Sequence, residues 1–240
     1  PKAYAPKISV IMSVYNMADD PLLYQSVNSI LRQTYDNWEL IICDDGSTDH
    51  TLYILCRFAT DQRIRVLRNS TNRGAGAARN ACIRASSGKY IAVMDEDDVS
   101  DPRRLKKQAE FLEAHPEYAF VGSSVWLKDR HGIWGRRRLE EVPERKSFLS
   151  TLPLVHPSVM IRADAVKALR GYTQAGVARR AEDYEFFMRL YALGYKGYNM
   201  QEELVSYLEE LDSYKKRNYR SRIAECVVRL RGFKQLGILK

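Results

Sequence analysis

Four consecutive acids in the middle of the chain are the residues best suited to chemistry. The apolar run IAVM, residues 91–94, leads directly into Asp95, Glu96, Asp97 and Asp98. Adjacent carboxylates repel one another and raise each other's pKa unless water or a positive charge screens them. Alternate acids of an extended segment, such as Asp95 and Asp97, point their oxygens in a common direction. This arrangement suits a hard divalent cation that also binds phosphate oxygens.

A plainer interpretation of these acids is a solvated turn that leads into a helix. Asp101 and Pro102 have the residue types of a helix N-cap and first helical position. A cap, however, needs one acid near the helix start, whereas Asp95 and Asp97 lie several residues upstream. We therefore favour a cation site and leave the turn as the alternative.

The segment NRGAGAARN, residues 72–80, resembles a glycine-rich dinucleotide loop only superficially. Arg79 stands at the third glycine position, and the segment follows polar residues, not an apolar strand. A Rossmann dinucleotide site is therefore not expected. A nucleoside diphosphate still fits, with Arg73 and Arg79 as contacts to phosphate or base. The alternative is a helix start with exposed arginines.

Two further motifs place single titratable residues near predicted secondary structure. His156 precedes Pro157 and a short strand, where a lone histidine is more often structural than a ligand. Glu182 and Asp183 fall in the first turn of a predicted amphipathic helix, where the helix dipole alone favours acids. The functional alternative for one of these acids is a general base that takes a proton from a hydroxyl.

Composition places these motifs in an ordinary globular chain. The 240 residues are 45% hydrophobic and 28% charged, which suits one large domain, or one domain with an appendage. The longest nearly apolar stretch, Ile8 to Tyr15, is shorter than the roughly 20 residues of a membrane span. The first residues lack the apolar region of a secretory signal. The spacing of the four cysteines argues against zinc and against a disulfide framework.

Alternating strands and helices are expected to position the motifs in the first half of the chain. Apolar, β-branched runs predict strands at residues 8–14, 39–43, 64–67 and 90–94, separated by helices that begin near Pro21, Leu52 and Ala75. Such alternation predicts a parallel sheet with right-handed crossovers. Ligands bind beyond the carboxyl ends of such strands. Tyr15–Asn16, Asp44–Asp45 and the acidic run are therefore expected along one rim, sharing one cleft.

The second half predicts mixed α and β structure packed beside the parallel sheet. We expect a helix from Pro102 to about Ala114, a strand at 119–127, a hairpin turn at His131–Gly132, a strand at 159–161 and a helix at 182–193 that ends at Gly194. No linker separates the halves, so we predict one domain over residues 1–210. Trp134 and Arg136 to Arg138 lie in a region expected to choose the acceptor.

Residues 211–240 are predicted to form a basic amphipathic helical tail. Between Tyr214 and Lys240 there are nine basic residues and a single acid, Glu225. This segment therefore accounts for the whole net charge of +8. Ile223, Val227 and Leu230 repeat at helical spacing. This apolar side either packs on the domain or docks on anionic lipid.

The set of motifs resembles the family 2 inverting glycosyltransferases, bacterial enzymes that use nucleotide sugars. The resemblance covers most of the chain and rests on six segments in order: ISVIMSVYN, ELIICDDGSTD, NRGAGAARN, MDEDD, HPSVMIR and AEDYEFFMRL. Ser13 stands where the family most often has proline. The resemblance implies the GT-A fold, an α/β fold in which a mostly parallel nucleotide-binding sheet is flanked by helices, with an α+β acceptor-side half and here the C-terminal basic helix.

The resemblance also implies roles for individual residues. Asp183 corresponds to the catalytic base of the family's ED motif. Asp97, in the family's DxD motif, corresponds to a ligand of Mg²⁺ or Mn²⁺, and His156 is expected to approach the diphosphate or metal. The nucleotide-binding residues implied by the resemblance are Ser13, Tyr15, Asp44, Asp45, Arg73, Asp95 and Glu96.

The resemblance implies transfer of a sugar from a nucleoside-diphosphate sugar, with UDP as the default, to a hydroxyl. The acceptor would be a glycan or a lipid-linked glycan in polysaccharide synthesis, with the enzyme in the cytoplasm or peripheral on the inner face of the bacterial membrane. The alternatives are a nucleotidyltransferase, a non-catalytic sugar-nucleotide binding protein and a nucleic-acid-binding protein. The body outside the tail has no net charge and no evident aromatic-basic platform, so we expect no nucleic acid partner.

Overall fold

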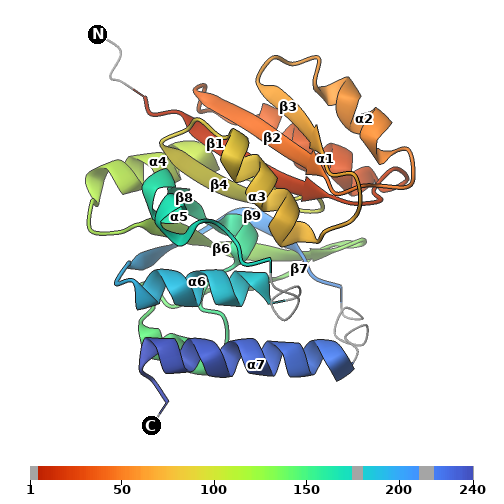
Figure 1. Ribbon diagram of the computed structural model, residues 1–240. Coiled ribbons are helices and arrows are strands. Elements are labelled where there is room, and N and C mark those ends of the chain that lie inside the picture. The colour runs from red at the N-terminus through yellow and green to blue at the C-terminus, as the bar shows by residue number, and fades with distance from the viewer. Residues whose placement is uncertain (1–4, 175–180, 211–218, 240) are drawn as a thin grey trace.

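The computed structural model describes residues 5–174, 181–210 and 219–239 (Figure 1). The N-terminal half alternates strands and helices as expected: β1 (Ile8–Val14), α1 (Pro21–Leu31), β2 (Trp38–Asp44), α2 (Thr51–Phe58), β3 (Ile64–Arg68), α3 (Ala75–Ala85) and β4 (Tyr90–Asp95). The four strands are parallel in the order β3-β2-β1-β4. The predicted parallel sheet is thereby confirmed.

The second half continues the same sheet with strands of mixed direction. Its elements are β5 (Val99–Ser100), α4 (Arg104–Ala114), β6 (Phe120–Asp129), β7 (Gly132–Arg137), the 3₁₀ turns η1 (Arg145–Leu149) and η2 (His156–Ser158), β8 (Met160–Arg162), α5 (Ala163–Leu169), α6 (Glu182–Ala192), β9 (Gly197–Leu208) and α7 (Tyr219–Leu236). β8 is antiparallel to β4 and to β6, and β9 is parallel to β6. The sheet order is β3-β2-β1-β4-β8-β6-β9-β5, with β7 paired to β6.

Helices cover both faces of the sheet, which explains why the parallel strands are continuously apolar. Successive residues of a strand point to opposite faces. Ile11, Ile41 and Val93 pack in one core cluster that also contains apolar residues of α3, α5, α6 and α7. Val10 and Ile42 pack on the other face, with apolar residues of α1, α2 and α4. Strands buried on both faces lose the apolar–polar alternation of half-exposed strands.

β9 is the largest element that the sequence analysis did not predict. It runs along β6, and Leu208 at its end lies opposite Lys128. The ladder shifts register on both sides of Ser124, so the period-two pattern of β9 is interrupted in its polar middle. The helix expected to begin at Pro102 begins instead at Arg104, because the Asp101 carboxylate accepts the Arg103 N–H in a turn that precedes it.

α7 packs on the domain through a different side from the predicted apolar stripe. Val228, Phe233 and Leu236 are buried in the same core cluster as α6, and Figure 1 shows the two helices side by side. Ile223 and Leu230 are 47% and 56% exposed. The predicted docking stripe is therefore on the outside of α7. The basic residues Lys215, Lys216 and Arg217 of the predicted tail lie outside the described residues.

Candidate functional site

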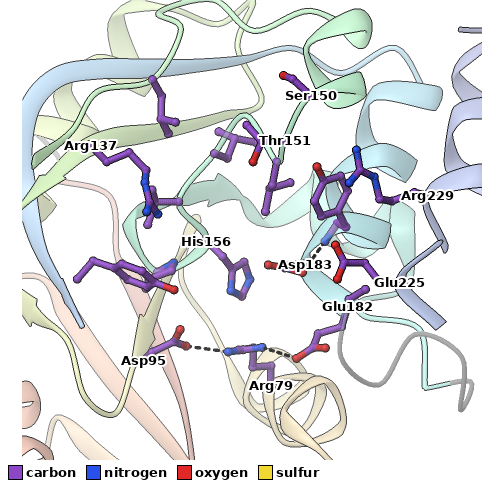
Figure 2. A pocket seen from close by; sticks show the side chains of 18 of the residues that line it. Arg79, Asp95, Arg137, Ser150, Thr151, His156, Glu182, Asp183, Glu225 and Arg229 are labelled. Carbon is purple, nitrogen blue, oxygen red and sulfur yellow. Dashed lines mark hydrogen bonds and ion pairs between the residues drawn. The ribbon is translucent and has the colours of Figure 1, made fainter. Parts of the chain in front are cut away.

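A cavity of about 850 Å³ brings together three of the predicted site residues. Asp95 ends β4, His156 opens η2, and Asp183 lies in the first turn of α6 (Figure 2). They come from segments up to 88 positions apart in the sequence but lie around one hollow beyond the end of β4. The sheet order explains this, because β8, the strand that follows η2, lies beside β4.

Arg79 connects the donor side of the cavity to the start of α6. Its side chain is 7% exposed; Nη2 donates to Oδ1 of Asp95 at 2.7 Å, and Nη1 donates to Oε1 of Glu182 at 3.4 Å. Burial, the largest single effect, disfavours the ionised form of Asp95, but the charge and hydrogen bond of Arg79, together with smaller contributions from His156 and Arg104, lower the pKa of this carboxyl. The predicted alternative of an exposed arginine is wrong for Arg79.

In the acidic loop, residues 95–98, burial and then mutual repulsion disfavour the ionised forms of the three acids that follow Asp95. Burial, and then repulsion from Asp97 and Asp95, raises the pKa of Glu96 to about 8. Burial and the Asp95 charge raise the pKa of Asp97 to about 6. The pKa of the fully buried Asp98 is raised well above its usual value for the same reasons. These shifts are expected of clustered carboxylates that have too little positive charge nearby.

Two buried cations lie beneath the acidic loop without neutralising it fully. Arg104, on α4, is completely buried and donates to the carbonyls of Val93 and Val159. Lys128, on β6, is 8% exposed, and its ammonium has no hydrogen-bond partner among the described residues. The Oδ2 atom of Asp98 is likewise without a partner there.

The loop has the donors that a hard cation requires, although they do not form a closed site. Carboxylate oxygens are the preferred ligands of Mg²⁺, and the raised pKa values show that added positive charge would stabilise the loop. The described residues contain no group of three His, Cys, Asp or Glu side chains close enough to bind a metal by themselves. A cation here would therefore keep water or substrate oxygens among its ligands, with Asp97 as the candidate protein ligand.

His156 is held in a fixed orientation by Tyr172. Its Nε2 lies 2.7 Å from the Tyr172 hydroxyl, and burial, reinforced by the Arg79 charge, lowers the histidine pKa to about 3. The imidazole is therefore neutral near pH 7. Tyr172 is held in turn, because Asn80 accepts its backbone N–H and donates to its carbonyl. Gly171, at φ 77°, permits this approach, since a Cβ atom there would lie 2.2 Å from Asn80 Oδ1.

Asp183 has the burial and orientation required of a general base. Its Oδ1 accepts the backbone N–H of Tyr184 at 2.7 Å. Burial raises the pKa of Asp183 and outweighs this hydrogen bond. Figure 2 shows the carboxylate turned toward the hollow, near His156. A base with a raised pKa binds a proton more readily than an exposed aspartate does.

Asp45 organises the loop that precedes α3. Its side chain is 2% exposed and accepts hydrogen bonds from Asn69 Nδ2, from Arg73 N and from Gly74 N. Gly46, at φ 73°, lets the two loops touch, since a Cβ atom there would lie 2.6 Å from the backbone of Thr71. Asp45 thus fixes the conformation of the loop before α3. Its contact with a nucleotide base stays a prediction.

The other predicted nucleotide residues lie along the same rim but do not line the cavity. Val14 and Asp44 are paired across β1 and β2, and Ser13 pairs with Asp95 across β1 and β4, so the strand ends are aligned as expected. Ser13 and Asp44 are buried, whereas Tyr15 is 40% exposed and Arg73 is exposed. Residues at the ends of β1, β2 and β4 were expected to share one cleft. Of these, only Asp95 lines the cavity.

The far side of the cavity contains residues that the sequence analysis did not single out. Tyr184 lies beneath the guanidinium of Arg229, which belongs to α7 and donates to the carbonyl of Leu149. Arg137, which the sequence analysis did name in the region expected to choose the acceptor, also lines the cavity and donates to both carboxylate oxygens of Glu209. No local sequence signal marks Tyr172 or Arg229, because their places depend on contacts between distant segments.

Taken together, the arrangement can remove a proton next to a site for a negatively charged group. Asp183 and Asp95 lie at one hollow, with the neutral His156 between them (Figure 2). Arg79 connects Asp95 to Glu182 at the start of α6. A hydroxyl beside Asp183 could lose its proton, and a cation held at the acidic loop would stabilise an anionic leaving group.

The comparisons with known proteins agree on one family. The model of "Glycosyl transferase family 2" matches residues 9–170. EpsE of Bacillus subtilis, which is named as a glycosyltransferase, is 43% identical over 89% of this chain and 77% of its own. TuaG of Bacillus subtilis, named for teichuronic acid biosynthesis, is 32% identical over 85% of this chain and 79% of its own. WfgD of Escherichia coli, a β-1,3-glucosyltransferase, is 39% identical over 44% of this chain and 40% of its own.

Solved structures show the same fold. TarS of S. aureus in complex with UDP superposes with a TM-score of 0.73 at 20% identity, over 96% of this chain and 69% of that one. The mannosyltransferase PcManGT from Pyrobaculum calidifontis, in complex with GDP-Man and Mn²⁺, has a TM-score of 0.68 at 17% identity, over 98% of this chain and 73% of that one. Both are GT-A structures, so the predicted fold class is confirmed.

Proposed function

This chain belongs to glycosyltransferase family 2, which serves polysaccharide or glycan synthesis, and from that premise we propose a more specific reaction. The enzyme transfers a sugar from a nucleoside-diphosphate sugar, UDP-linked, to a hydroxyl of a glycan or lipid-linked acceptor, with inversion at the anomeric carbon. Family membership also argues against the nucleotidyltransferase and nucleic-acid alternatives.

The observation that carries this proposal is the position of Asp183 in the same cavity as Asp95. An inverting transfer needs a base on the face of the sugar opposite the leaving nucleotide. The base and the donor-side acid lie on different elements, α6 and β4, with the hollow between them (Figure 2). Direct displacement across that space requires no covalent enzyme intermediate.

The residues of this chain act on the acceptor and on the donor separately. Asp183 accepts the proton of the attacking hydroxyl, and the Tyr184 N–H keeps its carboxylate oriented. Arg79 fixes Asp95, which we assign to the donor ribose by the family resemblance, and fixes Glu182 at the start of α6. His156, neutral and oriented by Tyr172, lies on the donor side of the cavity, where it can contact the diphosphate or its metal.

Asp97 and, by the family resemblance, His156 would bind Mg²⁺ or Mn²⁺ together with the donor diphosphate. When bound, the ion would supply a Lewis acid that stabilises the charge growing on the leaving diphosphate. The raised pKa values of Glu96 and Asp97 support this proposal, since they are those of a loop short of positive charge. Ser13, Tyr15, Asp44, Asp45, Arg73 and Glu96 stay as proposed nucleotide contacts.

The relatives' names support the choice of donor and acceptor classes. TarS has been solved with UDP and with UDP-GlcNAc. WfgD is named for transfer from UDP-Glc to a diphosphoundecaprenol-linked GlcNAc, which is a lipid-linked acceptor. We therefore place the enzyme in the cytoplasm, peripheral at the inner face of the bacterial membrane. No helix within the described residues has the length and apolar character of a membrane span.

A screen of sugar nucleotides tests the proposal. Thermal denaturation is followed with UDP-sugars and GDP-sugars, each with and without Mn²⁺, and the donor that stabilises most is then assayed for transfer to lipid-linked and water-soluble glycan acceptors. We expect metal-dependent stabilisation by a UDP-sugar and a product whose anomeric configuration, read by NMR, is opposite to that of the donor. Retention of configuration would refute the inverting mechanism.

A further inference from the structure

The cavity extends past Asp183 to the C-terminal helix. Glu225 and Arg229 of α7 line it together with Tyr184 of α6. In Figure 2, Asp183 lies between Arg229 on the α7 side and Asp95 on the other side. The donor is assigned to the side of Asp95, so an acceptor whose hydroxyl meets Asp183 has to lie on the side of α7.

The guanidinium of Arg229 is held in place before any ligand binds. Its Nη2 donates to the carbonyl oxygen of Leu149 at 3.0 Å. Its Cζ atom lies 5.3 Å from the ring centroid of Tyr184 and 5.5 Å from that of Phe233, so two aromatic rings support the cation. A side chain that is already ordered loses little conformational entropy when it binds a ligand.

The charge of Arg229 is not paired with a carboxylate in the part of the chain that the structure describes. The other three arginines of the cavity wall each have such a partner: Asp95 for Arg79, Glu209 for Arg137 and Glu203 for Arg138. A guanidinium has five N–H donors in a planar fork, and the carbonyl of Leu149 accepts one of them. Arg229 therefore retains both a positive charge and N–H donors for a ligand.

Arg229 is tied structurally to the proposed base. Tyr184, whose ring supports the guanidinium, directly follows Asp183 in the sequence and donates its backbone N–H to Oδ1 of that carboxylate. The cation and the base are therefore positioned by the same residue. An acceptor sugar that places its hydroxyl at Asp183 would bring a neighbouring substituent toward Arg229.

We propose that Arg229 binds an oxyanion of the acceptor, a phosphate ester or a carboxylate next to the sugar that presents its hydroxyl to Asp183. The guanidinium fork matches two oxygens of such a group, and hydrogen bonds between charged partners are stronger than those between neutral ones. A half-buried guanidinium without an ion pair gains more from an anion than from a neutral hydroxyl, because the anion also compensates its charge. The inference rests on the proposed function and names the acceptor class of that site.

A binding experiment tests this subsite without sugar transfer. The full chain is first saturated with UDP and Mn²⁺, which fill the donor side, and is then titrated calorimetrically with hexyl phosphate or with hexyl glucuronide, which carries a carboxylate. We expect at least one of the two probes to bind, and Arg229→Gln to weaken that binding by about tenfold to a hundredfold. The preferred probe tells whether the oxyanion belongs to a phosphate or to an acidic sugar. Binding of neither probe, or equal binding by the variant, would overturn the proposal.

Matched variants show whether the loss arises at Arg229 itself. Arg231→Gln removes an exposed cation two residues further along α7 and should bind the probe as the wild type does. An equal loss in this control would point to the overall charge of α7 and would count against the proposal. An unchanged Kd for UDP shows that Arg229→Gln is folded. Arg229→Lys keeps the charge but loses the fork, so it should still weaken probe binding severalfold even if Arg229→Gln fails to fold.

Glu225 distinguishes an oxyanion site from a site for a neutral sugar. Its carboxylate lines the same side of the cavity, one helical turn before Arg229, and would repel an anion there. Glu225→Gln should therefore strengthen binding of the anionic probe. Weaker binding by this variant would show that the subsite binds hydroxyl groups through Glu225, and the proposal would be wrong.

The outcomes separate this inference from the proposed function. A chain that bound the probe through Arg229 but transferred no sugar would refute the proposed function alone. A chain that transferred sugar equally well to a neutral hexyl glycoside and to the same sugar linked through phosphate, with Arg229→Gln unimpaired on both, would refute the oxyanion subsite alone.

Discussion

Arg79 and Asp95 form a buried ion pair, with Nη2 of the arginine 2.7 Å from Oδ1 of the aspartate, and the same guanidinium reaches Glu182 at 3.4 Å. The pair joins the end of β4 to the start of α6. The donor side of the cavity and the element that bears Asp183 are therefore fixed to each other through one side chain.

Removal of Arg79 should destabilise the protein strongly. Arg79→Ala leaves Asp95 and Glu182 without their shared partner. A buried charge left without its partner lowers the free energy of unfolding by about 3 to 5 kcal/mol. Chemical denaturation measures this loss in the free energy of unfolding. Arg84→Ala, an exposed position on the same helix, should change it by less than about 0.5 kcal/mol. Equal effects of the two substitutions would argue against the bridge.

Tyr172 should act on catalysis through His156. Tyr172→Phe removes the hydroxyl that lies 2.7 Å from Nε2, so the imidazole can rotate away from the donor. We expect kcat/KM for the donor to fall by about tenfold to a hundredfold, as for other supporting hydrogen bonds to a functional histidine. Steady-state kinetics with varied donor concentration measures it.

The matched control is Tyr191→Phe, which also removes a buried hydroxyl bond, here to the carbonyl of Pro143 away from the cavity. Both variants should lose stability by about 1 kcal/mol. A similar loss of kcat/KM in the control would show that Tyr172 has only a structural role.

Glu96 should make the metal-free protein less stable as pH rises. Its pKa is raised from 4.5 to about 8 in the folded state, so between these values the folded chain holds a proton that the unfolded chain releases. Stability contributed by this group is therefore full below pH 4.5 and declines until pH 8. Glu96→Gln should match the wild type at the acid end and exceed it by about 1 to 3 kcal/mol at pH 8.

Denaturation of both proteins across this pH range measures the difference. Glu110→Gln, a mostly exposed position on α4, serves as the control and should change stability at pH 8 by less than about 0.5 kcal/mol. Added Mn²⁺ with UDP should raise wild-type stability most at high pH, where the acidic loop is charged. A constant difference between Glu96→Gln and wild type would contradict the assigned shift.

α7 should behave as part of the domain and not as a separable tail. Phe233 is 8% exposed against α6, so Phe233→Ala should cost about 3 kcal/mol, whereas Leu230→Ala, at 56% exposed, should cost less than about 0.5 kcal/mol. A single cooperative unfolding transition, shifted only by the first variant, is the expected result. Two transitions would instead support the predicted division of the chain at residue 210.

The parallel half of the fold was predictable because its strands are buried on both faces and its helices begin with clear signals. The runs at residues 8–14 and 90–94 match β1 and β4 to within one residue, and the helix starting at Ala75 matches α3. Their order also predicted that Asp44 and Asp95 would lie along one rim.

Elements that depend on partners far away in the sequence were not predictable in the same way. β9 has glutamates at 202 and 203 and a shifting register, so neither periodicity nor composition marks it as a strand. α7 approaches α6 closely at Gly232, where a Cβ atom would lie 2.1 Å from Met188 Sδ, and this contact has no local signature in the sequence. Tyr172 and Arg104 were missed for the same reason, since only the folded chain places them beneath the site.

The central claim is that Asp183 is the base that accepts the proton of the acceptor hydroxyl. Its isosteric replacement by asparagine gives the most direct test. Asp183→Asn keeps the shape of the side chain and the hydrogen bond from Tyr184 but cannot accept the acceptor proton. Sugar transfer and donor-nucleotide affinity should be measured side by side on wild type and variant. The account predicts a fall in kcat of at least about a hundredfold with the Kd of the nucleotide unchanged. Transfer at the wild-type rate would contradict it.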